Sequence, residues 1–121
     1  MQVLIILNHM VEYSEEELSA VLKALSDRTR RDLLVQLCQH GSSRVTDLAK
    51  IYDMSLNAIS KHIKVLESVG LVTRKTTGRS HWIEAEIEQI AVVERWFSQL
   101  KSIWTLRLDK LEQLLNTGEE L

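Results

Sequence analysis

Proline is absent from this sequence of 121 residues, and glycine occurs only four times. Because proline and glycine interrupt helices and form most tight turns, their scarcity predicts long helices with few breaks. Aromatic residues make up only 5% of the chain, so we expect few strands. The composition therefore indicates a mainly helical chain that forms one domain and is large enough to bury its own core.

Cysteine and long apolar runs are also scarce. The single Cys38 excludes an internal disulfide and a zinc site of several cysteines, which fits a reducing, cytoplasmic compartment. No apolar run approaches the ~20 residues of a membrane span, and the run at residues 3–7 is too short for a signal peptide. We expect residues 1–13 to form an extension, or a segment that packs on a dimer, and residues 14–118 to form the single domain.

Capping residues and apolar spacing predict three helices in the first half of the domain. Ser14 precedes three glutamates as an N-cap, Asp27 caps a second helix that ends at Gly41, and residues 45–52 form a short third helix. A sharp turn follows at Asp53. The residues expected to face inward are Leu18, Val21, Leu22, Leu25, Leu33, Leu34, Leu37, Cys38, Val45, Leu48, Ala49 and Tyr52.

A fourth helix, residues 55–69, carries the most informative pattern. Its apolar residues recur at helical spacing and are expected to face the core: Leu56, Ile59, Ile63 and Leu66. The opposite side collects Asn57, Ser60, Lys61 and Lys64 and contains no acid. An ordinary solvated face would carry charges of both signs, whereas amides, hydroxyls and lysines suit base edges and phosphates. After a short helix and a tight turn, this face is typical of a helix-turn-helix that enters the DNA major groove.

A basic hairpin is predicted directly after this helix. The segments "LVTRKT" and "SHWIEA" flank the turn "TGR", so residues 71–85 read as two antiparallel strands. Arg74, Lys75, Arg79 and His81 lie on or near its tip. Such a hairpin is the wing of a winged helix, which contacts the phosphate backbone or the adjacent minor groove.

These segments together resemble the ArsR family of bacterial winged-helix repressors over about residues 15–115. The resemblance rests on "ALSDRTRRDLLVQL", "VTDLAKIYDMSLNAISKHIKVLESVGLV" and "TTGRSHWIEA". It implies a homodimer that binds a palindromic double-stranded DNA operator and represses transcription. Asp53 departs from the glycine usual in such turns, but aspartate tolerates a left-handed conformation. By position, the resemblance assigns DNA contacts to Ser55, Asn57, Ala58, Ser60, Lys61, His62, Lys64, Arg74, Lys75 and Arg79, and the hairpin adds His81.

The C-terminal third predicts a long helix that begins near Ile90. Its apolar band is too broad for a small winged-helix core to cover, so a second copy of the chain is the expected partner. The alternative is a helix that folds back on its own domain. A dimer would place two recognition helices about 34 Å apart. The residues predicted at the dimer interface are Leu18, Val21, Val93, Trp96, Phe97, Leu100, Ile103, Trp104, Leu108 and Leu111.

Metal sensing, which is common in this family, lacks its residues here. The family's best-known site uses a Cys-x-Cys pattern on the third helix, where this sequence has Val45 and Asp47. A second family site uses carboxylates and histidines on the last helix, which here offers Glu94, Asp109 and Glu112 but no histidine. We therefore expect no metal and no cofactor, and we expect Cys38 to be a small core residue rather than a redox switch.

Three alternatives remain for the function. Trp96, Phe97 and Trp104 either pack together or line a pocket for an unidentified effector, so a sensor with an unrecognised small-molecule, protein or metal site stays open. A winged helix can also serve as a protein-interaction module, but that module predicts an apolar or acidic face where this sequence is basic. An enzyme is not expected, because the sequence offers no phosphate loop, metal cluster or paired nucleophile and base.

Overall fold

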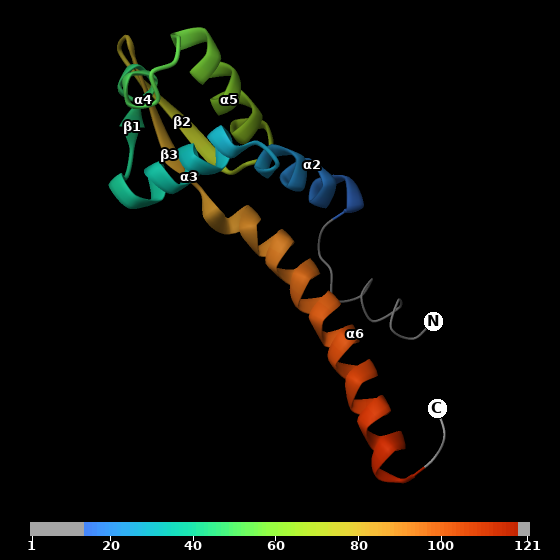
Figure 1. Cartoon of the computed structure of the whole chain (residues 1–121). Helices are drawn as coiled ribbons and strands as arrows, with labels where there is room; N and C mark the ends of the chain where they lie inside the picture. The colour runs from blue at the N-terminus through green and yellow to red at the C-terminus, as the bar shows by residue number, and fades with distance from the viewer. Residues whose placement is uncertain (1–13, 119–121) are drawn as a thin grey trace.

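The computed structural model describes residues 14–118, which form a helical body, a projecting hairpin and one long helix (Figure 1). The predicted mainly α winged helix-turn-helix is confirmed. Residues 1–13, predicted to form an extension, lie outside the described residues. The elements are α2 (Glu15–Leu25), α3 (Arg28–His40), β1 (Ser43–Arg44), α4 (Val45–Ile51), α5 (Leu56–Ser68), β2 (Val72–Thr77), β3 (Ser80–Ala85), the 3-10 turn η1 (Ile87–Gln89) and α6 (Ile90–Asn116).

Side-chain caps start three of the helices, as predicted. Ser14, Asp27 and Ser55 each accept a hydrogen bond from the backbone N–H three residues later, at 3.0 to 3.1 Å. These bonds satisfy amides that have no partner inside the helix. Asp53, in the turn between α4 and α5, has φ of 49°, which is the left-handed conformation expected there. Local chemistry therefore sets where α5 begins.

The core lies where α2 to α5 meet the sheet. Ile59, Ile63 and Leu66 of α5 are at most 1% exposed and pack in the main cluster of buried residues. Three predictions of core residues are wrong. Leu22 is 38% exposed, because it lies about 100° around the axis of α2 from the buried Val21. Leu56 is 52% exposed, because it stands in the first turn of α5, ahead of the part that meets the core. Cys38 is also exposed, because it lies about 100° around the helix axis from Leu37, outside the buried arc of α3.

The sheet has three antiparallel strands in the order β1-β3-β2. β2 and β3 form the predicted hairpin, joined by the two-residue turn Gly78 and Arg79. Gly78 has φ of 61°, as the first central position of a type II′ turn requires. β1 was not predicted, since two residues are too few to show alternation. It exists because Ser43 and Arg44 pair with β3 across about forty residues of chain.

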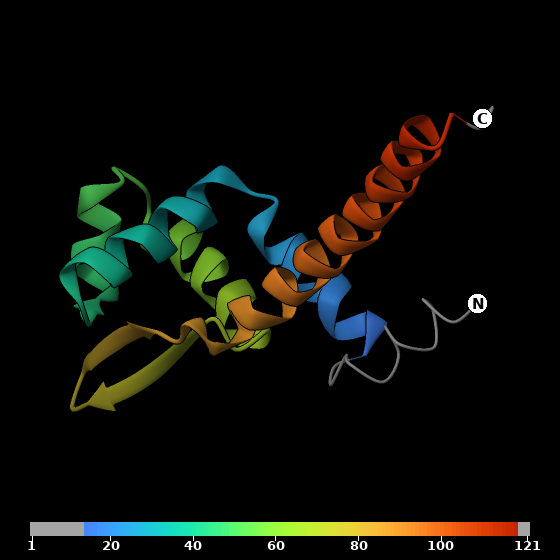
Figure 2. The same ribbon diagram turned by 90° about the horizontal axis from the view of Figure 1, so that it is seen from below.

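Helix α6 has 27 residues, about 40 Å at 1.5 Å per residue, and it extends well beyond the body (Figures 1 and 2). Only its first turns join the core, where Val92 is buried and Val93 is half-buried. Leu18 and Val21 of α2 are 4% and 2% exposed within the protomer, because α2 packs on its own chain, including α6. Their place at a dimer interface stays a prediction. Among residues 14–118, no helix is long and apolar enough to cross a membrane.

Replacing the cap of α3 tests how far this bond supports the fold. Asp27→Ala should lower the urea midpoint of unfolding, because the Arg30 amide loses its acceptor. The same bond lowers the pKa of the Asp27 carboxyl below its usual range, with His62 and Arg30 adding to the effect. The folded-state pKa is thus below the unfolded one. The stabilisation is therefore present at neutral pH and is lost as the pH falls through the folded value.

Asp27→Asn is the matched control, since its amide oxygen still accepts the bond. Its urea midpoint at neutral pH should lie between those of the wild type and Asp27→Ala. Equal midpoints for Asp27→Ala and the wild type would contradict a stabilising cap.

Candidate nucleic-acid interface

Helix α4, the first turns of α5 and the hairpin tip lie at one end of the molecule, away from the free end of α6 (Figure 1). The order of α4, turn and α5 is that of a helix-turn-helix, with the hairpin as its wing. This end therefore brings together the elements that carried the predicted contacts.

The outward stripe of α5 is polar and basic, as predicted. Asn57, Lys61 and Lys64 are exposed, and they share one side because each residue turns the helix by about 100°. The only acid of α5, Glu67, lies about 60° around the helix from Lys64, beyond the edge of the stripe and on the side that faces the hairpin. There its Oε2 is 3.5 Å from Nε of Arg74. No acid therefore lies on the stripe itself.

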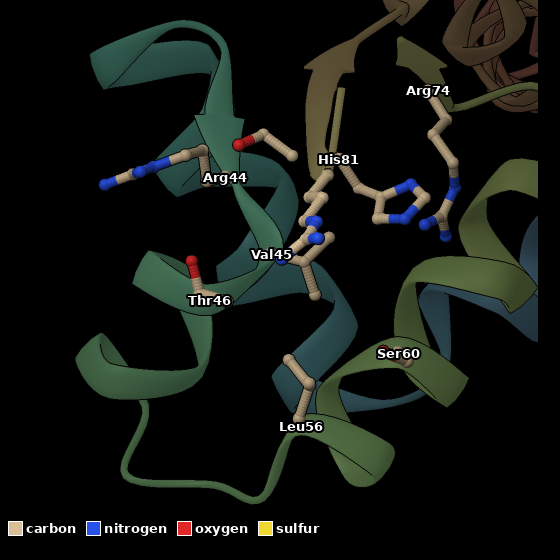
Figure 3. Close-up of a pocket in the computed structure, with 9 residues that line it drawn as sticks. Arg44, Val45, Thr46, Leu56, Ser60, Arg74 and His81 are labelled. Atoms are coloured by element: carbon tan, nitrogen blue, oxygen red, sulfur yellow. The ribbon is translucent and has the colours of Figure 1, made fainter. Parts of the chain in front are cut away.

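A groove of about 340 Å³ separates α4 and α5 from the hairpin (Figure 3). Its lining contains three arginines and one histidine but no acidic side chain. Such a lining favours an anionic group such as a phosphate. The exposed Leu56 forms part of its apolar floor. The lining residues are Arg44, Val45, Thr46, Leu56, Ser60, Arg74, Arg79, Ser80 and His81.

Arg44 and Thr46 were missed by the sequence reading. Arg44 belongs to β1, within a polar link that showed no periodicity, and Thr46 belongs to the first turn of α4, on the side of the predicted helix away from its apolar residues. The only signal available for Arg44 was a basic residue in an otherwise polar loop. Their place in the groove follows from the pairing of β1 with β3, which a local sequence pattern does not predict.

Strand alternation divides the hairpin residues that were predicted as one surface. Arg74 and His81 lie on the side of the sheet that carries the buried Val72 and Ile83, and both line the groove (Figure 3). Lys75 points to the opposite face, because successive strand residues alternate. Arg79 is exposed in the turn itself. The structure therefore separates Lys75 from the other three.

His62 lies away from the outward stripe of α5. Its side chain is 22% exposed, with Nδ1 3.4 Å from Nη1 of Arg30 and 3.8 Å from Oδ2 of Asp27. Arg30 also donates to the carbonyls of Ala24 at 2.6 Å and Lys23 at 3.1 Å, at the end of α2. His62 therefore connects α5 to the corner between α2 and α3, which is a positioning role.

The other predicted α5 residues occupy the helix start. Ser55 is the N-cap, and its hydroxyl accepts from the amide of Ala58, whose own side chain is half-buried. Among residues 14–118, no three His, Cys, Asp or Glu side chains gather closely enough to hold a metal ion.

The position of His62 leads to a prediction that distinguishes a structural role of this side chain from a contact with DNA. His62→Ala should lower the free energy of unfolding by about 1 kcal/mol, the usual net value of one hydrogen bond. The salt dependence of DNA binding should not change. Urea unfolding and anisotropy titrations at several salt concentrations measure the two effects. A shallower salt dependence at unchanged stability would instead place His62 against a phosphate.

Comparison with known proteins agrees with this geometry. Residues 27–74 match the family described as "Bacterial regulatory protein, arsR family". The HTH-type transcriptional regulator Rv2034 of Mycobacterium tuberculosis is 30% identical over 95 residues, which are 78% of this chain and 85% of that protein. The arsenical resistance operon repressor of Bacillus subtilis is 32% identical over 68 residues, or 56% of this chain and 65% of that repressor.

A solved structure extends the likeness to most of the fold. The crystal structure of an ArsR family transcriptional regulator is 35% identical, with a TM-score of 0.72 over 78% of this chain and 96% of that one. Identity, coverage and fold therefore agree with the helix-turn-helix and wing described above. The chain belongs to the ArsR family of DNA-binding transcriptional regulators.

Proposed function

We propose that this protein is a dimeric repressor that occupies an inverted-repeat operator, with α5 in the major groove and the hairpin against the neighbouring backbone. One observation carries the proposal: the acid-free stripe of Asn57, Lys61 and Lys64 runs beside a groove lined by arginines. Base readout needs such a helix face, and phosphate contacts hold it in register. Repression then follows from blocking access to the promoter in the cytoplasm.

The residues of the stripe and the groove suit different parts of the duplex. Asn57 offers a paired donor and acceptor for a base edge, and Ser60 offers a hydroxyl. Lys61, Lys64 and Arg79 are exposed cations that suit phosphates. Arg74 and His81 would act from inside the groove, where Glu67 holds Arg74 in place.

A second copy of the chain is the partner that α6 requires. Phe97, Leu100 and Trp104 are 48%, 49% and 59% exposed in the protomer, although all three are large and apolar. They share a band with Trp96, which meets Phe97 edge-on at a ring distance of 5.2 Å. Because α6 extends away from the body, the protomer itself leaves this band uncovered (Figure 2). A two-fold dimer would bury it on both copies at once.

The remaining interface residues fall into two groups. Ile103, Leu108 and Leu111 continue the exposed or half-buried band along α6, whereas Val93 already packs on the protomer core. An effector pocket at Trp96 and the neighbouring rings stays a prediction from the sequence. No contact among the described residues favours a pocket over packing against a second copy.

The operator itself can be found by selecting duplexes from a random pool with the purified protein. A selected inverted repeat that is bound in the presence of excess random DNA would support the proposal. Selection of no preferred sequence, from a protein with native helical content, would contradict it. An interaction module would then be the better explanation.

Two cations should contribute through phosphates alone. Lys64→Ala or Arg79→Ala should weaken binding to operator and random DNA alike. Each should also reduce the slope of log affinity against log salt concentration by about 0.9. The reason is that each phosphate contact releases about 0.9 of a counterion from the DNA. Anisotropy titrations over a range of salt concentrations measure the slope, and an unchanged slope would remove the residue from the backbone contacts.

Asn57 should contribute to sequence discrimination instead. Asn57→Ala is expected to reduce the preference for operator over random DNA by about 1 to 3 kcal/mol, the value of one good base contact. Competition titrations with both DNAs measure the preference. An equal loss of affinity for the two DNAs would show that Asn57 contacts the phosphate backbone rather than a base.

The proposed dimer can be tested with a charge placed on the band. Leu100→Glu should shift the protein from dimer to monomer in sedimentation experiments and weaken operator binding, because burying a carboxylate among apolar side chains is costly. Ser102→Glu is the matched control, since residue 102 lies about 200° around α6 from residue 100. Its mass should stay that of a dimer. Equal behaviour of both variants would contradict the proposed interface.

A further inference from the structure

The outer face of the sheet, away from α5, carries a row of three side chains that includes two cations. In the register of the sheet, Arg44 of β1 and Lys75 of β2 both stand opposite Trp82 of β3. An aromatic ring that is 36% exposed therefore has one cation on each side. We call Arg44, Trp82 and Lys75 the outer row.

Arg44 is held in a defined position within this row. Its Nε donates to Oδ2 of Asp47 at 3.0 Å, and its Nη2 donates to Oδ1 at 3.4 Å. Its Cζ lies 5.8 Å from the centre of the Trp82 ring, within the range of a cation–π contact. A guanidinium has five N–H donors, and Asp47 takes only two of them. The others remain for a further anion.

The outer face is open to solvent. Thr73, Lys75, Trp82 and Glu84 are all exposed, and Lys75 makes no ion pair among the residues that the structure describes. The acid on this face, Glu84, stands opposite Thr73, one step farther from the hairpin tip than Trp82. The part of the face nearest the tip is therefore the positive part.

The outer row is continuous with the proposed DNA surface. Arg44 also borders the groove, but Figure 3 shows its side chain extending away from Arg74 and His81. Cations therefore surround the hairpin: on the groove side, in the turn at Arg79, and on the outer face at Lys75 and Arg44. A hairpin whose tip approaches a minor groove has one phosphate backbone on each side of it.

We propose that the outer row binds phosphates of the DNA that flanks the operator, on the side of the hairpin away from α5. Trp82 and Asp47 position Arg44, and Lys75 supplies the second charge. Charge complementarity and continuity with the groove favour DNA over an acidic protein as the occupant. The inference rests on the proposed function, because it extends the footprint of the same DNA.

Two duplexes separate the outer row from the operator contacts. One ends at the edges of the selected operator, and the other continues on each side by about one helical turn, ~10 base pairs. The test variant is Arg44→Gln with Lys75→Gln. The matched control is Arg95→Gln with Lys23→Gln, which removes one arginine and one lysine from exposed positions on α6 and α2, away from the hairpin and from the apolar band of α6.

The wild type should show a steeper salt dependence on the long duplex than on the short one. The test variant should lose about 0.9 of the log–log slope per phosphate on the long duplex and bind the short duplex like the wild type. The control should behave as the wild type on both. Lys75→Gln alone, which removes no contact within the chain, should give about half the loss.

Two results would overturn the inference. A test variant that matches the wild type on both duplexes would exclude flanking DNA and leave an acidic protein as the occupant. An equal loss on both duplexes would place the row inside the operator contacts. Lys64→Ala, measured in parallel, reports separately on the proposed function, since it should weaken binding to both duplexes whatever the outer row does.

Discussion

The burial of one side of α5 determines how this protein can meet DNA. Ile59, Ile63 and Leu66 are at most 1% exposed, and each contributes about 1.5 to 3 kcal/mol through burial. Because these three side chains fix the rotation of the helix, Asn57 and the lysines must face outward. A change of one residue in phase would rotate the helix by about 100° and remove both lysines from the outward side. Leu56, Ser60 and Ile63, or Ala58, His62 and Val65, would then face outward instead. Stability and recognition therefore depend on the same contact.

Acidic residues support this surface without covering it. Glu67 pairs with Arg74 and Asp47 with Arg44, so two acids of a chain with net charge −2 are used to hold arginines at the groove. Both pairs are partly exposed, and such pairs add little to stability. Their effect is positional, since a guanidinium held in place loses less conformational freedom when it binds a phosphate. Acids elsewhere on the surface would repel DNA from the wrong orientations.

The surface of α6 that we propose for dimer assembly lies apart from the surface that faces DNA. Its apolar band begins where the core ends, and its free end lies far from the hairpin (Figure 1). Contacts made by a second copy would therefore leave the DNA-facing end of each protomer open. His62 and Arg30 join α5 to the corner between α2 and α3, while α2 packs on α6. The proposed dimer surface of α6 and the recognition helix are thus connected through a small number of named contacts.

Local patterns alone determined the helices, their caps, the left-handed turn at Asp53, the hairpin and the basic stripe of α5. Each of these depends on residues within a few positions of one another, where spacing and capping chemistry act directly. The tertiary structure decided the exposure of Leu56 and Cys38, the burial of Leu18 and Val21, and the inward turn of His62. It also decided the strand at Arg44 and the split between Arg74 and Lys75. These outcomes depend on residues that are distant in the chain. The spacing of residues predicts which side chains share one face of a helix or strand, but it does not predict which element packs against that face.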